Sequence, residues 1–304
     1  MTSLNQKKSK FTATLIGFIA ILLWALLALF TASSGDIPPF QLAAMTFSIG
    51  ASIGVSRWFF KPSSIKALKQ PLSVWALGIV GLFGYHFAYF TALRNAPPVD
   101  ASLIAYLWPL FIVLLSALLP GEKLKLHHII GALLGLSGAF IIVSKGSLVS
   151  FQDEYRYGYF MAFFCAVIWS SYSVMSRRFS HISSDVVTGF CIATAVLATL
   201  AHVFLEETQW PSDSIQWLAI LGLGLGPVGL AFYTWDYGVK HGDIQVLGAA
   251  SYMAPLLSTL VLVLMGFAEF TLTIGLACIL ITSGAVVAAK ELIFNKANSK
   301  CQND

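Results

Sequence analysis

Long apolar runs separated by short polar loops cover almost the whole chain. Each run is about 20 residues long, which is the length that an α-helix needs to cross the hydrocarbon core of a bilayer. The runs lie at roughly 12–33, 37–58, 71–93, 97–119, 126–144, 157–178, 184–205, 213–239, 243–267 and 270–292. This pattern predicts an all-α integral membrane protein with ten transmembrane helices.

Basic residues are concentrated in alternate loops. With the N-terminus inside, fifteen of the eighteen Lys and Arg residues lie in the inner segments, and only Arg94, Lys145 and Arg156 lie in the outer ones. Positive charge near helix ends accumulates on the cytoplasmic side. One helix more or fewer would reverse every later loop, so this separation supports the number of spans and predicts that both termini are cytoplasmic. The net charge of +4 therefore reflects orientation and calls for no nucleic-acid partner.

Composition argues against most other classes of protein. Of the 304 residues 57% are hydrophobic and 11% charged, whereas soluble domains carry roughly a quarter charged residues. The sequence has no metal-ligand spacing, no phosphate-binding glycine loop and no nucleophile with a partner base. We expect no enzyme, cofactor or metal site. The basic N-terminus resembles a signal peptide, but its apolar run is longer than a usual signal core. Free thiols are expected for Cys165, Cys191, Cys278 and Cys301.

The chain repeats itself after 145 to 146 residues. This shift aligns "AYLWPL" at 105–110 with "SYMAPL" at 251–256. The aligned pairs include Tyr106 with Tyr252, Pro109 with Pro255, Leu110 with Leu256, Ser137 with Ser283, and Trp24 with Trp169. Each copy holds five predicted helices, and because five is odd the second copy must enter the membrane from the opposite face. The sequence therefore predicts two inverted five-helix repeats around a central cavity, as in many secondary transporters.

The repeat also sets the expected organisation of the chain. The first repeat is expected at 12–146 and the second at 157–292, with cytoplasmic tails at 1–11 and 293–304.

Prolines fall at matching points of the two halves. Proline removes a backbone donor and clashes with the preceding turn. A carbonyl freed in this way must face protein or a water-filled cavity, and paired interruptions point to a site near the membrane midplane. We expect Pro109 and Pro255, with Gly226 and Pro227 in the eighth helix, to act as hinges. The alternative is that these prolines only set packing curvature.

Three of the eight tryptophans are predicted near the bilayer centre. Trp24, Trp108 and Trp169 lie eleven or twelve residues into their helices, which is about 17 Å at 1.5 Å per residue. An indole N–H facing lipid would lack a partner, so these rings are expected to face protein or a pore. Tight helix packing is the alternative. The tryptophans interpreted as interfacial residues near helix ends are Trp58, Trp75, Trp210, Trp217 and Trp235.

His86 is the only ionisable side chain predicted well inside a span, and such groups are functional candidates. A neutral histidine bonded to a neighbouring helix is the alternative. Asp185, Asp236 and Asp243 are expected near the cytoplasmic mouth, in surface pairs with Lys240. The absence of a midplane Asp or Glu argues against carboxylate-based proton coupling. The candidate substrate-binding residues are His86, Trp108, Trp169, Tyr106, Tyr252, Trp24, Tyr89, Ser173 and Tyr233.

Several stretches resemble a known family. "GEKLKLHHIIGALLGLSGAFIIV" at 121–143 and its weaker copy at 268–287 resemble the repeat ends of EamA-type ten-helix exporters of the drug/metabolite transporter superfamily. "YTWDYGVKHGDIQVLGAASYMAPLLS" at 233–258 is most similar to the bacterial aromatic amino acid exporters. The resemblance covers nearly the whole chain, and it implies that Trp108, Trp169 and His86 line a central cavity.

The resemblance implies an exporter of aromatic and other neutral amino acids in a bacterial inner membrane. Such an exporter works by alternating access, and we expect a monomer that contacts lipids and a small-molecule substrate. Two alternatives stay open. One is a carrier of drugs, nucleosides, sugar derivatives or cations with the same architecture, and the other is a membrane scaffold or sensor without transport.

Overall fold

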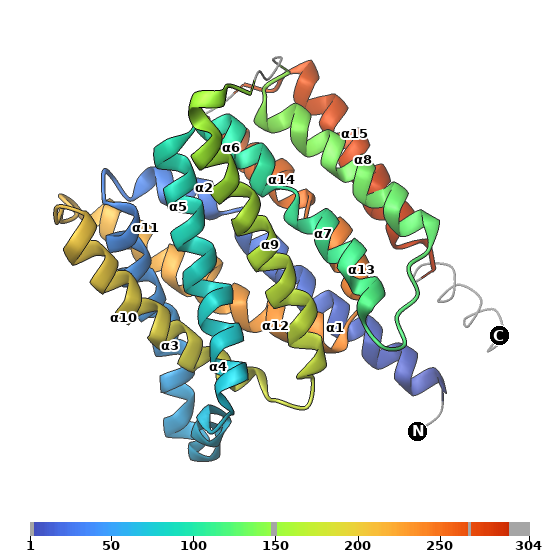
Figure 1. The fold of residues 1–304 in the computed structure, drawn as a ribbon, viewed down its shortest axis with the longest axis horizontal. Helices are drawn as coiled ribbons and strands as arrows, with labels where there is room; N and C mark the ends of the chain where they lie inside the picture. The colour runs from blue at the N-terminus through green and yellow to red at the C-terminus, as the bar shows by residue number, and fades with distance from the viewer. Residues whose placement is uncertain (1–2, 147–150, 267–268, 292–304) are drawn as a thin grey trace.

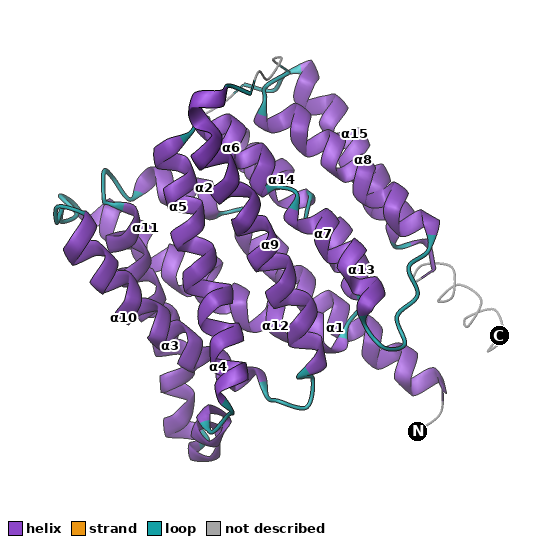
Figure 2. Cartoon of the chain, in the orientation of Figure 1, coloured by secondary structure: helices purple, strands orange, loops and turns teal. Residues whose placement is uncertain are grey.

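The computed structural model describes residues 3–146, 151–266 and 269–291, and every regular element within these ranges is helical (Figures 1 and 2). The long helices are α1 (Ser3–Trp24), α3 (Pro39–Phe60), α8 (Leu126–Val143), α9 (Arg156–Arg178), α10 (Val187–Leu205) and α15 (Leu272–Ala288). The shorter ones are α2 (Leu27–Ser33), α4 (Leu72–Ile79), α5 (Tyr85–Asn95), α6 (Pro98–Ala105), α7 (Trp108–Leu115), α11 (Ser214–Leu225), α12 (Ala231–His241), α13 (Ile244–Ala250) and α14 (Met253–Leu264). The predicted tail at 293–304 and Cys301 lie outside the described residues.

Eight helical stretches of the described chain are long and apolar enough to cross a membrane. They are Ser9–Ser33, Leu72–Asn95, Pro98–Leu118, Leu126–Val143, Asp153–Arg178, Ser184–Leu205, Ser214–His241 and Ile244–Leu264. Two predicted spans fall outside this set. The first, α3, is less apolar because it carries Gln41, Thr46 and three serines, and the second, α15, has only 17 residues. The protein is therefore a multi-pass membrane protein built from helices.

Helices from the two halves of the chain pack against each other. The main pairs are α8 with α15, α3 with α10, α1 with α12, and α5 with α9. Figure 1 shows α8 and α15 along one edge of the bundle, and α3, α10 and α11 along the opposite edge. Glycines permit the closest contact, because a Cβ on Gly131 would lie 2.6 Å from the Gly284 carbonyl oxygen. Small residues of this kind allow membrane helices to pack backbone against backbone.

Backbone irregularities recur at matching positions. A π turn, η2 (Val80–Gly84), joins α4 to α5, and a second one, η6 (Gly226–Leu230), joins α11 to α12. Their first residues are 226 − 80 = 146 positions apart, and π turns are frequent at functional sites. Gly226 and Pro227 thus lie in a π turn within a continuous helical stretch.

The helices are also broken at Tyr106–Leu107 and at Ser251–Tyr252. Pro109 and Pro255 lie just after these breaks, in the first turn of α7 and of α14. A missing N–H costs little in a first helical turn, since no intrahelical acceptor awaits it there. The prolines therefore begin new helices after the breaks and do not kink helix interiors.

Candidate functional site

Four tryptophans meet where α1, α7, α9 and α12 come together. The ring centroids of Trp24 and Trp235 are 5.1 Å apart, and Trp24 lies 6.0 Å from both Trp108 and Trp169. The Trp169 and Trp235 rings are nearly parallel, with centroids 6.3 Å apart. Trp108, Trp169 and Trp235 are buried, whereas Trp24 is partly exposed. We call these four residues the tryptophan cluster.

Two of the four indole N–H groups of the cluster have partners that fix the ring orientations. Trp24 Nε1 donates to the Pro227 carbonyl at 3.1 Å, so the π turn of the eighth predicted span supplies an acceptor. Trp235 Nε1 donates to Ser173 Oγ at 3.0 Å. Ser173 therefore orients a cluster ring from the facing helix.

The structure brings Trp24, Trp108 and Trp169 together, but the interfacial interpretation of Trp235 was wrong. Trp235 is 0% exposed because its face of α12 packs against α1 and α9. One signal in the sequence could have revealed it. The repeat shift aligns Trp235 with Tyr89 (235 − 146 = 89), which was already a candidate.

A wall of polar rings lies beside the tryptophan cluster. It consists of Tyr85, His86 and Tyr89 on α5 and Tyr106 at the break before α7, and all four are partly exposed. The Tyr85 and Trp169 ring centroids are 5.4 Å apart. Tyr85 and Tyr89 stack with centroids 6.0 Å apart and an interplanar angle of 7°. We call these four residues the tyrosine–histidine wall.

His86 provides a hydrogen-bond acceptor in the tyrosine–histidine wall. Its Nδ1 lies 2.7 Å from the Leu82 carbonyl oxygen, one turn earlier in the chain. A carbonyl can only accept, so Nδ1 holds the proton and Nε2 is the acceptor of the neutral ring. Nε2 has no hydrogen-bond partner among the described residues, and the ring packs edge-on against Phe47 with centroids 5.0 Å apart. The neutral imidazole therefore offers an acceptor for a ligand N–H group.

Two candidate tyrosines point elsewhere. Tyr252 is 0% exposed and packs against Gly135 of α8, where an added Cβ would lie 2.5 Å from the ring. Its hydroxyl accepts a hydrogen bond from the Leu110 amide at 3.2 Å. The Tyr233 hydroxyl donates to Thr188 Oγ1 at 3.1 Å. Among the ring contacts of the described chain, neither tyrosine joins the tryptophan cluster, so in this structure both hold helices together.

The predicted surface pairing of Asp236 with Lys240 was also wrong. The two side chains are 1% and 3% exposed, and Lys240 Nζ lies 2.8 Å from Asp236 Oδ2. Lys240 Nζ also donates to the Ile182 carbonyl at 3.1 Å. The pair is buried because its face of α12 packs against α9 and against the segment that precedes α10. These residues are buried although they lie near the end of a span.

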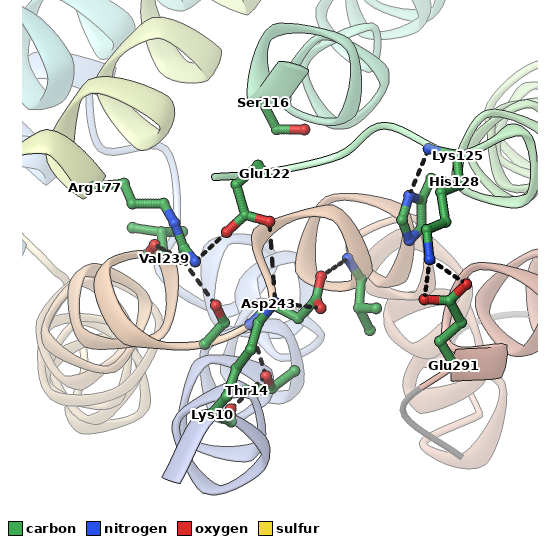
Figure 3. Close-up of polar contacts among 12 residues, drawn as sticks. Lys10, Thr14, Ser116, Glu122, Lys125, His128, Arg177, Val239, Asp243 and Glu291 are labelled. Atoms are coloured by element: carbon green, nitrogen blue, oxygen red, sulfur yellow. Dashed lines mark hydrogen bonds and ion pairs between the residues drawn. The ribbon is translucent and has the colours of Figure 1, made fainter. Parts of the chain in front are cut away.

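An ion network joins both halves at the end of the bundle near the N-terminus (Figure 3). Glu122 pairs with Arg177, and its second oxygen lies 4.0 Å from Lys10 Nζ. Lys10 Nζ also lies 2.9 Å from Asp243. Arg177 donates to the carbonyls of Val239 and Gly242, both at 2.8 Å. We call these contacts the Glu122 network.

The chemistry of Asp243 keeps this network charged. Burial raises the pKa of the Asp243 carboxyl, but Lys10 and the Val246 amide lower it by more, so the pKa lies below its ordinary value. The carboxylate is therefore ionised at neutral pH.

Comparison with known proteins decides the family. The sequence profile of the EamA-like transporter family matches residues 11–144 and again residues 156–289. The chain belongs to the EamA-like transporter family.

Relatives of this EamA-like transporter include proteins named as amino acid exporters. "Aromatic amino acid exporter YddG" of Ancylobacter novellus is 53% identical over 281 residues, which cover 92% of this chain and 98% of the relative. The exporter of the same name from Salmonella typhimurium is 26% identical over 258 residues, with 81% and 86% covered. A solved crystal structure at 53% identity matches with a TM-score of 0.89 and covers 92% of this chain and 97% of its own.

The geometry suits an EamA-like transporter of flat organic solutes. The tryptophan cluster offers apolar ring faces, and the tyrosine–histidine wall offers hydroxyls and an imidazole acceptor. Aromatic rings prefer stacked or edge-to-face contacts with other rings at such centroid distances. The tryptophan cluster draws residues from both halves of the chain, because Trp24 and Trp108 come from the first half and Trp169 and Trp235 from the second. The tyrosine–histidine wall lies entirely in the first half.

Proposed function

We propose that this chain exports aromatic and other neutral amino acids across a bacterial inner membrane by alternating access. The observation that carries the proposal is the tryptophan cluster beside the tyrosine–histidine wall, deep within apolar helices. Ligand sites are typically lined by apolar and aromatic side chains with a few polar groups that orient the ligand, and these residues have that composition. The name of the relative that is 53% identical, over 98% of that relative's length, supports the same substrate class.

We further propose ten spans arranged as two inverted repeats, at 12–146 and 157–292. The helix pairs support this arrangement, because each contact has an equivalent when the two halves are exchanged. The pairs α8–α15 and α3–α10 join equivalent helices, and the contact between α1 and α12 corresponds to the contact between α9 and α5. The matched π turns and the matched breaks add further support. Under this arrangement α3 and α15 complete the ten spans, and both termini are cytoplasmic by the distribution of basic residues.

In this account the Glu122 network closes the cytoplasmic side of the site. It joins Lys10 and Glu122 of the first half to Arg177 and Asp243 of the second, so this end cannot open while the network is intact. Glu269, which aligns with Glu122 when the repeat shift slips by one residue to 147, forms no ion pair among the described residues at the other end. We propose that the outer side opens more easily, and that the breaks before Pro109 and Pro255 and the π turn at Gly226 and Pro227 absorb the movement.

Flux measurements test the substrate class. Purified protein in liposomes should transport radiolabelled phenylalanine in preference to a nucleoside and to a cationic dye. Trp108→Ala and Trp169→Ala should each lower phenylalanine flux at least about tenfold, as expected when a buried aromatic contact with the ligand is lost. Trp217→Ala removes an exposed tryptophan (47%) and serves as the control. Equal flux of all three solutes, or no phenylalanine flux, would contradict the proposal.

A further inference from the structure

The buried pair Asp236 and Lys240 continues the substrate site toward the Glu122 network. On α12 Phe232, Asp236 and Lys240 follow one another at intervals of four residues, so their side chains form one column. At the head of this column the Phe232 ring centroid lies 5.7 Å from Trp169 and 6.3 Å from His86. The pair thus begins one helical turn below the aromatic rings.

A second column on the facing helix runs alongside the first. On α9 it consists of Trp169, Tyr172 and Ser176, and the Tyr172 ring lies next to Trp169 with centroids 5.3 Å apart and an interplanar angle of 32°. A small cavity of about 10 Å³ is lined by Ser176, Asp236 and Lys240 together with apolar side chains, among them Leu77 and Phe190. This volume has room for about one water molecule. Polar side chains from both columns therefore line the same small cavity.

The polar groups around this cavity are incompletely satisfied. Asp236 Oδ2 lies close to Lys240 but off the direction of a hydrogen bond, so it has no hydrogen-bond partner among the described residues. Burial of unsatisfied polar groups and of ion pairs costs free energy, and apolar residues of similar volume would be as stable or more so. Stability alone therefore does not account for the pair.

A larger hollow lies just outside the small cavity. Its volume is about 470 Å³, and Arg57, His181, Asp185 and Tyr237 are among its lining residues. Ile182 lines both spaces, so a thin partition separates the buried pair from the hollow. A ligand that arrives from this end of the bundle meets Asp236 and Lys240 before it reaches the tryptophan cluster.

We propose that Asp236 and Lys240 bind the charged head group of the transported amino acid. The α-ammonium group would pair with Asp236 and the α-carboxylate with Lys240, while the side-chain ring rests in the tryptophan cluster. This inference rests on the proposed function and narrows it to zwitterions.

Charge matching supports this assignment. A zwitterion carries both charges on neighbouring groups, so its insertion replaces one buried ion pair with two and buries no net charge. The tyrosine–histidine wall presents only hydroxyls and an imidazole, and so offers no charged partner of either sign while His86 is neutral. The pair thereby selects amino acids over amines and acids that bear the same ring.

Three substrates that share one ring provide the test in liposomes. They are phenylalanine, phenethylamine, which lacks the carboxylate, and 3-phenylpropionate, which lacks the ammonium group. The parent protein should transport phenylalanine about tenfold or more better than either analogue, because hydrogen bonds between charged groups are among the strongest. The double variant Asp236→Asn with Lys240→Gln replaces both charged groups by neutral amides and leaves no unpaired charge. It should lose this preference, through a fall in phenylalanine transport, while the two analogues change by less than about twofold.

A matched control and a second measurement keep the inference falsifiable. The double variant Lys125→Gln with Glu291→Gln removes an exposed ion pair, 2.7 Å apart, that lines neither space, and should keep the preference. Binding of the three compounds to the parent, followed by tryptophan fluorescence, should show the same order without any variant. Equal affinities in the parent, or a retained preference in the Asp236/Lys240 variant, would overturn the inference while the proposed function stands. Failure of the parent to transport phenylalanine would refute both.

Discussion

Tyr106 and Tyr252 occupy equivalent positions in the two halves of the chain, but their side chains lie in different surroundings. Each stands at a helix break and precedes a proline by three residues. Tyr252 is fully buried, and its hydroxyl accepts from the Leu110 amide of the other half. Tyr106 is partly exposed in the tyrosine–histidine wall. The helix breaks are present in both copies, whereas one tyrosine holds two helices together and the other lines the proposed site.

The same division extends over the rest of the site. The repeat shift of 146 aligns Tyr89 with Trp235, Phe90 with Asp236, and Arg94 with Lys240. The first half therefore supplies the hydroxyls and the imidazole of the wall, the second supplies the buried ion pair, and the tryptophan cluster takes two indoles from each half. An amino acid is itself asymmetric, with an apolar ring at one end and two charges at the other. Two halves with different chemistry suit such a ligand better than two identical ones.

The largest expected effect comes from Trp235, the indole that aligns with Tyr89. Trp235→Ala should lower phenylalanine flux at least about tenfold, because it removes a ring from the cluster and leaves Ser173 without its donor. Tyr89→Phe, which keeps the ring, should cost much less. Flux into liposomes measures both, with Trp217→Ala as control. Normal flux in Trp235→Ala would show that the Trp235 indole is not part of the substrate site.

The next effect concerns the two ends of the bundle. Arg177→Gln removes the link between Glu122 and the carbonyls of Val239 and Gly242. The site should then open more often to the cytoplasm, and a cysteine at buried Ser176 should react about tenfold faster with an impermeant thiol reagent from that side. Arg178→Gln alters the adjacent exposed arginine and should leave the rate unchanged. Equal rates in the two variants would remove the network from the closure of this end.

A smaller effect separates the two tyrosines themselves. Tyr252→Phe leaves the Leu110 amide without its acceptor, so thermal unfolding in detergent should show a loss of about 1–2 kcal/mol, with an unchanged KM. Tyr106→Phe should leave stability unchanged and raise the KM by about two- to fivefold through one lost ligand hydrogen bond. The opposite assignment of stability and KM effects would reverse the roles given to the two copies.

The smallest expected effect is that of Pro255→Ala. The proline lies in the first turn of α14, where its missing N–H costs little, so substrate affinity should change by less than about twofold. Turnover should fall modestly, because the fixed φ of proline keeps the break in place during each cycle. Binding and turnover measured on one preparation distinguish these effects. An equal loss of both would contradict a role in movement.

Periodicity and repeats in the sequence predicted the features that depend on spacing. The apolar runs, the matched breaks beside Pro109 and Pro255, and the meeting of Trp24 with Trp108 and Trp169 all follow from spans of one length duplicated in tandem. Backbone groups in the hydrocarbon core must form their hydrogen bonds within the helix, so each span is a continuous helix. Its position can therefore be predicted from a run of apolar residues.

Features that depend on helix rotation could not be predicted in this way. Trp235 and the Asp236–Lys240 pair lie near the end of a span, where both interfacial and buried positions are common, and only packing against α9 decides between them. The Tyr252 side chain likewise turns toward α8 because Gly135 leaves room for its ring. The sequence alone does not show which neighbouring helix a side chain faces.

A crystal structure with bound 4-iodophenylalanine tests the central claim most directly. If both halves build one site for aromatic amino acids, the anomalous signal of iodine should lie among Trp24, Trp108, Trp169 and Trp235. An iodine position away from these four rings, with the ligand bound and transported, would contradict the account.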